Sequence, residues 1–124
     1  MKYKRNEPFR YEFGIPVKGV FFISRMNGKT IASSEGEAQV LDISPSGLRM
    51  QCDLNIPSNQ LVEISMKIII GSREIPLIGN IMWQKKVYPS YHYGVALISD
   101  AFEEQIIFAL KEFQKNHRLL SSQD

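Results

Sequence analysis

Short segments with strand character follow one another as far as about Ile98, and this succession limits the possible folds more than any other feature of the chain. The segment 62–70 is the clearest, because apolar side chains alternate with polar ones over most of its length and predict a strand with one buried face. Turn residues such as Asn27-Gly28 and Gly71-Ser72 stand between these segments. Strands joined without intervening helices predict an antiparallel sandwich or barrel, with strands at 17–24, 38–44, 48–52, 62–70, 75–83 and 91–98.

The hydrophobic spacing changes after Asp100, which can cap a helix together with Glu103 three residues later. The apolar side chains that follow recur at helical spacing and predict one buried face, made of Phe102, Ile106, Ala109, Leu110 and Phe113. We expect this C-terminal helix to pack on the mouth or outer wall of the barrel.

Composition favours one soluble domain, since 124 residues with 44% hydrophobic and 23% charged side chains are typical of a globular protein. The apolar runs are far shorter than the roughly 20 residues that cross a bilayer, so we expect no membrane insertion. The N-terminus lacks the apolar stretch of a secretory signal, and the single cysteine, Cys52, agrees with a reducing compartment. Together these features predict a cytoplasmic protein.

The positive charge is concentrated at the N-terminus. Four of the 15 Lys and Arg residues and one of the 13 Asp and Glu residues fall within the first ten positions, which therefore carry +3 while the remainder carries −1. A duplex-binding protein usually spreads basic residues over a face, so this distribution suits a small anion better than a nucleic acid polymer. We expect a basic arm at 1–13, a barrel with its helix at 14–120 and a frayed tail at 121–124.

Asp42, Ser44 and Gly47 form a D-x-S-x-x-G turn motif at the end of the segment 38–44. The side chains of Asp42 and Ser44 can accept hydrogen bonds from nearby backbone amides, Pro45 fixes φ, and Gly47 can adopt conformations that other residues avoid. In isolation such a pattern is more often a structural turn than a binding site. The segments that surround this motif in the sequence favour a ligand-binding site instead.

An arginine-bearing segment precedes the first strand, Gly79 to Trp83 ends a later strand, Tyr93-Gly94-Val95 lies in the last strand, and an amphipathic helix follows. This ordered set resembles the PilZ domain family from about Lys4 to Phe113. The resemblance implies a six-stranded antiparallel β-barrel of the split-barrel type with a C-terminal helix. It also implies a receptor that binds cyclic di-GMP through an N-terminal RxxxR motif and the [D/N]xSxxG turn.

The turn motif maps onto Asp42, Ser44 and Gly47, whereas four residues rather than three separate Arg5 from Arg10. Either Arg5 reaches the ligand across one extra residue, or Arg10 acts with Lys4 or Arg5 in a changed geometry. The arginines suit the chemistry, because a guanidinium fork matches the O6 and N7 acceptors of guanine and can also stack on its ring. Asp42 either accepts from guanine N1 and N2 or orients an arginine or the turn.

The aromatic residues of the arm favour docking, so we expect Phe9, Tyr11 or Phe13 to pack on the barrel. Four other groups are assigned no ligand. The aromatic group Trp83, Tyr88, Tyr91 and Tyr93 is interpreted as packing rather than as a nucleic-acid stacking platform, and Lys85 and Lys86 as a solvated rim beside a loop. His92 and His117 lack metal-ligand spacing, and Cys52 is expected to be a buried thiol.

No enzyme motif is present, so the chain is predicted to be a non-enzymatic receptor without a cofactor. By the resemblance, it relays a bacterial cyclic di-GMP signal to an effector protein in motility, exopolysaccharide or biofilm control, as a monomer or homodimer. The altered arginine spacing leaves a second hypothesis open, a PilZ-like adaptor that binds protein but no nucleotide. A barrel that binds single-stranded nucleic acid is a third, weaker hypothesis.

Overall fold

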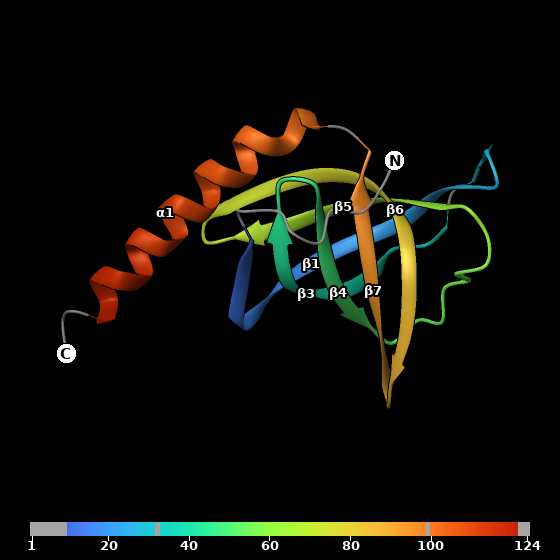
Figure 1. The fold of residues 1–124 in the computed structure, drawn as a ribbon, viewed down its shortest axis with the longest axis horizontal. Helices are drawn as coiled ribbons and strands as arrows, with labels where there is room; N and C mark the ends of the chain where they lie inside the picture. The colour runs from blue at the N-terminus through green and yellow to red at the C-terminus, as the bar shows by residue number, and fades with distance from the viewer. Residues whose placement is uncertain (1–9, 32, 99, 122–124) are drawn as a thin grey trace.

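The computed structural model describes residues 10–31, 33–98 and 100–121. In this part of the chain the strands precede the helices (Figure 1). The elements are β1 (Tyr11–Met26), β2 (Lys29–Thr30), β3 (Gly36–Ser44), β4 (Gly47–Cys52), β5 (Val62–Ile70), β6 (Arg73–Val87), β7 (Ser90–Leu97), the 3-10 turn η1 (Asp100–Phe102) and α1 (Glu103–Ser121).

Six of these strands form a closed antiparallel barrel. The order of hydrogen-bonded neighbours is β1-β3-β4-β7-β6-β5, and β5 then pairs with β1 to close the ring. The short strand β2 pairs only with the end of β1, through Arg25 with Thr30 and Met26 with Lys29. The predicted six-stranded barrel with a C-terminal helix is confirmed. Because the ring is closed, each of the six strands has a hydrogen-bonded neighbour on both sides over at least part of its length.

Strand β1 is longer than the predicted segment 17–24, because it closes the barrel and pairs with two neighbours. Its first part pairs with β3 from Tyr11 to Phe21, and its second part pairs with β5 from Gly19 to Met26. The register shifts between Glu12 and Val17, so the intervening Phe-Gly-Ile-Pro sequence forms an irregularity within one long strand. Strand β6 also runs past its predicted end, and Lys85 and Lys86 therefore lie in its last residues, where they are exposed next to the turn at Tyr88, as a solvated rim requires.

The predicted turns connect β1 to β2 and β5 to β6. Asn27 and Gly28 have φ angles of 53° and 83°, which a tight hairpin requires, and Gly71 has a φ of 65°. The turn between β3 and β4 has only Pro45 and Ser46 at its centre, since Ser44 pairs directly with Gly47.

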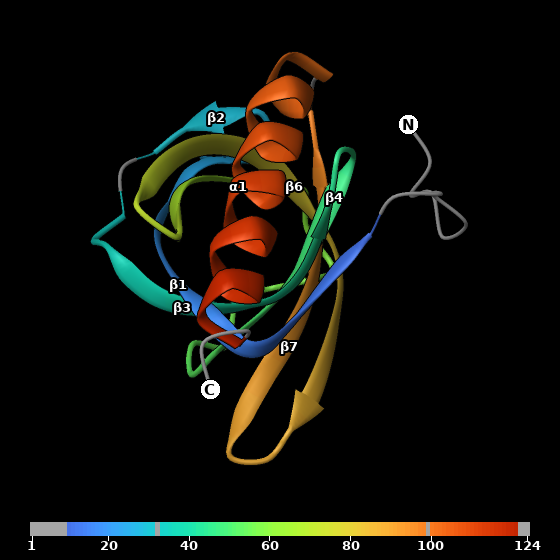
Figure 2. The same cartoon turned by 90° about the vertical axis from the view of Figure 1, so that its left-hand side faces the viewer.

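Helix α1 runs across one end of the barrel (Figure 2). The side chains of Ile106, Ala109 and Leu110 are buried, as the helical spacing predicted. Phe113 meets the rings of Tyr11 and Phe13 edge-on, with centroids 6.0 and 5.9 Å away. The predicted docking of the arm aromatics is therefore confirmed for Tyr11 and Phe13, while Phe9 lies outside the described residues. In the described part of the chain no helix is both long and apolar enough to cross a membrane.

Tyr93 is fully buried in the barrel core, and its hydroxyl joins β7 to the segment after β4. The hydroxyl accepts from the backbone N–H of Ile56 at 2.7 Å and from Nε2 of Gln84 at 3.1 Å, and it donates to the carbonyl of Leu54. Burial raises the pKa of Tyr93, so the hydroxyl keeps its proton at neutral pH.

Replacing Tyr93 with Phe leaves the buried Ile56 N–H without this acceptor. We expect the free energy of unfolding to fall by about 1–3 kcal/mol. Urea denaturation measures the change. Tyr91→Phe is the matched control on the same strand and is expected to change stability by less than about 0.5 kcal/mol. Equal effects of the two variants would contradict this role for the Tyr93 hydroxyl.

Candidate functional site

Asp42 lies on the outer side of the barrel wall, although the residue is only 3% exposed. It pairs with Arg49 across β3 and β4, and Arg49 stands between the core residues Leu48 and Met50, which point inward. A register shift after Val40 places Asp42 opposite Arg49. The carboxylate is therefore on the outer face, where basic side chains cover it.

Two guanidinium groups hold this carboxylate. Nη1 of Arg10 lies 2.6 Å from Oδ1 of Asp42, and Nε of Arg49 lies 3.0 Å from Oδ2. A buried carboxylate is costly unless it is paired and hydrogen-bonded, and here each oxygen has its own cationic donor. The ion pairs join the start of β1 to β3 and β4 and fix the position of both arginines.

The Arg49 side chain remains 40% exposed, which is more than the 23% of Arg10. The bond to Asp42 uses Nε of Arg49, so the N–H donors of the two terminal nitrogens are not used in this bond. A guanidinium anchored through Nε and open at its terminal nitrogens can bond to the paired acceptors of a guanine or of a phosphate.

The row of outward residues continues from Arg49 to Gly94 on β7 and Trp83 on β6. Tyr93 and Val95 point into the core, so the outer side of Gly94 is the one that the indole of Trp83 covers. A Cβ at position 94 would collide with Nε1, Cε2 and Cδ1 of that indole. Gly94 thus makes room for a half-buried aromatic ring next to Arg49, on the same wall as Asp42.

Hydrogen bonds stabilise the turn between Ser44 and Gly47. Oγ of Ser44 donates to the carbonyl of Gly47 at 3.2 Å, and the Ser44 side chain is buried. The N–H of Leu97 donates to the carbonyl of Ser46 at 2.9 Å, which fastens the turn to β7. Gly47 is a buried strand residue that pairs with both Ser44 and Ala96. In this arrangement Ser44 and Gly47 shape the turn that carries Asp42.

Of the residues proposed from the sequence, Arg10 and Asp42 are in direct contact, and Ser44 and Gly47 form the adjoining turn. Lys4 and Arg5 lie outside the described residues. Arg49 was missed, although its place between two apolar residues in a strand indicated an outward side chain. The packing interpretation holds for Tyr93, while Tyr88 is 86% exposed in the turn after β6, where no strand covers it.

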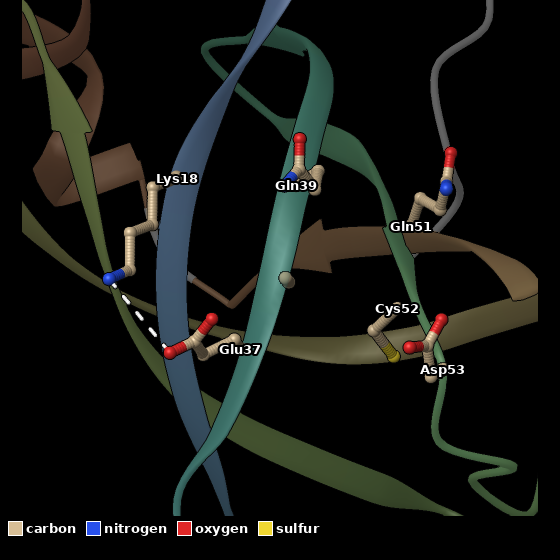
Figure 3. A pocket seen from close by; sticks show the side chains of 7 residues that line it. Lys18, Glu37, Gln39, Gln51, Cys52 and Asp53 are labelled. Carbon is tan, nitrogen blue, oxygen red and sulfur yellow. Dashed lines mark ion pairs between the residues drawn. The ribbon is translucent and has the colours of Figure 1, made fainter.

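A polar groove of about 320 Å³ opens on the wall formed by β1, β3 and β4 (Figure 3). Nζ of Lys18 lies 3.9 Å from Oε2 of Glu37 at one side of it. Cys52 borders the groove at the other side, but it is only 5% exposed, as expected for a structural thiol. Among the described residues, no cluster of three or more His, Cys, Asp and Glu side chains is placed to hold a metal ion.

The sequence model of the PilZ domain family matches residues 2–111, which is most of the chain. The chain therefore belongs to the PilZ domain family. PilZ domains are cyclic di-GMP-binding and adaptor domains and generally not enzymes. A search of curated proteins finds no match to this chain.

Burial raises the pKa of the Cys52 thiol, so little thiolate is present in the folded protein near neutral pH. We expect the native protein to react with Ellman's reagent at about pH 8 at least about tenfold more slowly than the urea-unfolded chain. The unfolded chain is a clean reference, because it contains one cysteine. Equal rates in the two states would show that the thiol is accessible.

Proposed function

We propose that this protein is a cytoplasmic cyclic di-GMP receptor that binds the dinucleotide on the outer wall of the barrel, at Arg10, Asp42 and Arg49. The observation that carries the proposal is the buried Asp42 carboxylate, which holds one guanidinium on each of its oxygens. An ion pair needed only for stability could be replaced by apolar packing at little cost. Two arginines held in fixed positions, one of them open to solvent, suit a ligand with paired acceptors.

In this proposal Asp42 orients the arginines, and the guanidinium groups contact the nucleotide. One fork bonds to O6 and N7 of a guanine, and a second cationic or aromatic face stacks on the base. The indole of Trp83 lies beside Arg49 and provides such a face. Each bidentate contact contributes about 1–3 kcal/mol of discrimination between bases.

Lys4 and Arg5 complete the proposed site from the N-terminal segment. Arg5 precedes Arg10 by five positions, a length of chain that spans at most about 18 Å when extended. Either residue can therefore reach a ligand anchored at Arg10, in spite of the four-residue spacing. The bound state would then present a changed surface to an effector protein, with motility, exopolysaccharide production or biofilm formation as the bacterial processes that the family suggests.

Calorimetric titration with cyclic di-GMP tests the proposal, with GTP and cyclic di-AMP as control ligands. We expect saturable binding of cyclic di-GMP and an affinity about tenfold to a hundredfold lower for Arg10→Ala and for Arg49→Ala. Arg25→Ala, at an exposed position on β1, is the matched control and should bind like the unaltered protein. Trp83 is the only tryptophan, so its fluorescence is a second readout of binding beside Arg49.

Absence of heat, of a fluorescence change and of a thermal shift at high ligand concentration would overturn the receptor proposal. The four-residue spacing of Arg5 and Arg10 would then favour the nucleotide-independent adaptor. Equal loss of binding in Arg25→Ala and Arg49→Ala would instead indicate a general effect of charge, without a defined site at Asp42.

A further inference from the structure

A second row of outward side chains lies beside the row that contains Arg49. Gln51 on β4 pairs with His92 on β7, and His92 pairs with Lys85 on β6. His92 is two residues from Gly94 on the same strand, so both point away from the core that holds Tyr93. Lys85 is likewise two residues from Trp83.

These registers place three basic side chains around one small area. Arg49 faces Gly94 directly and is therefore a diagonal neighbour of His92, at a Cα separation of about 7–8 Å. Lys85 is directly opposite His92. One phosphodiester group can contact two side chains at that spacing. Arg49 and Lys85 both neighbour His92, so one phosphodiester group bound at His92 can also contact these two cationic side chains.

The charged neighbours of His92 are mostly of its own sign. Burial, Arg49 and Lys85, in that order, lower the pKa of His92, so it is largely neutral near pH 7 in the free protein. Gln51 on β4 is neutral, and Asp53, just after the end of β4, accepts a hydrogen bond from Oγ of Ser90. On β3, Asp42 lies on the far side of Arg49, and Glu37 is paired with Lys18 of β1.

We propose that Arg49, His92 and Lys85 bind one phosphodiester group of the cyclic dinucleotide and that His92 takes up a proton when this group binds. The inference rests on the proposed function and deepens it, since it assigns a phosphate position and a pH dependence to the same wall of the barrel. A bound phosphate adds negative charge next to the imidazole and favours its protonated form. It thereby offsets the repulsion from Arg49 and Lys85.

The direction of the pH effect follows from linkage. The pKa of His92 is low in the free protein and higher in the complex, so the complex holds more protons between those two values. Affinity must therefore increase as pH falls through this interval. The phosphodiester groups of the ligand stay ionised throughout and contribute no change of their own.

Titrations of the full chain with cyclic di-GMP at about pH 8 and about pH 5.5 test the inference, and we expect about three- to tenfold tighter binding at the lower pH. His92→Gln removes the titrating group and should bind with the same affinity at both pH values. His117→Gln is the matched control and should keep the dependence of the unaltered protein. Circular dichroism at both pH values checks that each variant is folded.

Calorimetry near pH 6.5 in two buffers of different ionisation enthalpy gives a direct count of protons taken up on binding. We expect a fractional uptake in the unaltered protein and none in His92→Gln. Lys85→Gln should weaken binding about two- to tenfold at both pH values, because it removes a phosphate contact without a titrating group.

Binding that does not change with pH, or an equal pH dependence in His92→Gln and the unaltered protein, would overturn this inference and leave the receptor proposal intact. Absence of cyclic di-GMP binding at every pH would overturn the receptor proposal, and this inference with it. The two failures are therefore distinguishable in one set of titrations.

Discussion

The buried Asp42 carboxylate is the interaction on which the outer wall of this barrel depends. Its two oxygens are neutralised separately, by Arg10 from the beginning of β1 and by Arg49 from β4. Loss of either arginine would leave one oxygen of this poorly solvated carboxylate without its charged donor, which costs about 1–3 kcal/mol. The ion pairs thus fix the point at which the chain enters the barrel, and they hold two guanidinium groups on its outer wall.

The closed barrel makes this arrangement possible, because side chains from four different strands come into register on one wall. Asp42, Arg49, Gly94 and Trp83 stand in a row across β3, β4, β7 and β6. Register shifts between Val40 and Asp42 and between Ile81 and Trp83 turn the polar and aromatic members outward while the adjacent apolar residues stay in the core. Such irregularities are common next to binding sites, since they redirect single side chains.

Strands could be predicted from the sequence where one face is apolar and buried and the other is polar and exposed to solvent. The segment 62–70 has the same bounds as β5, because apolar and polar side chains alternate over most of its length and only Ile69 places an apolar side chain on the exposed face. The first strand was predicted too short, since Gly14 and Pro16 interrupt the pattern within β1. The motif identified Asp42, and chain order placed Arg10 near it, but the partnership of Asp42 with Arg49 required the register of β3 against β4. Likewise, the position of Trp83 over Gly94 follows from a bulge that no local pattern indicates.

We propose above that cyclic di-GMP binds the wall of the barrel that carries Asp42. An amide chemical-shift titration with cyclic di-GMP tests it most directly, since it reports on all walls of the barrel at once. We expect the shifts to gather on β4, β7 and the indole N–H of Trp83, while the amides of β5, which lies opposite β4 in the ring, stay unchanged. Shifts concentrated on the apolar groove between β1, β5 and β6, around Phe22, Met66 and Ile78, would contradict it.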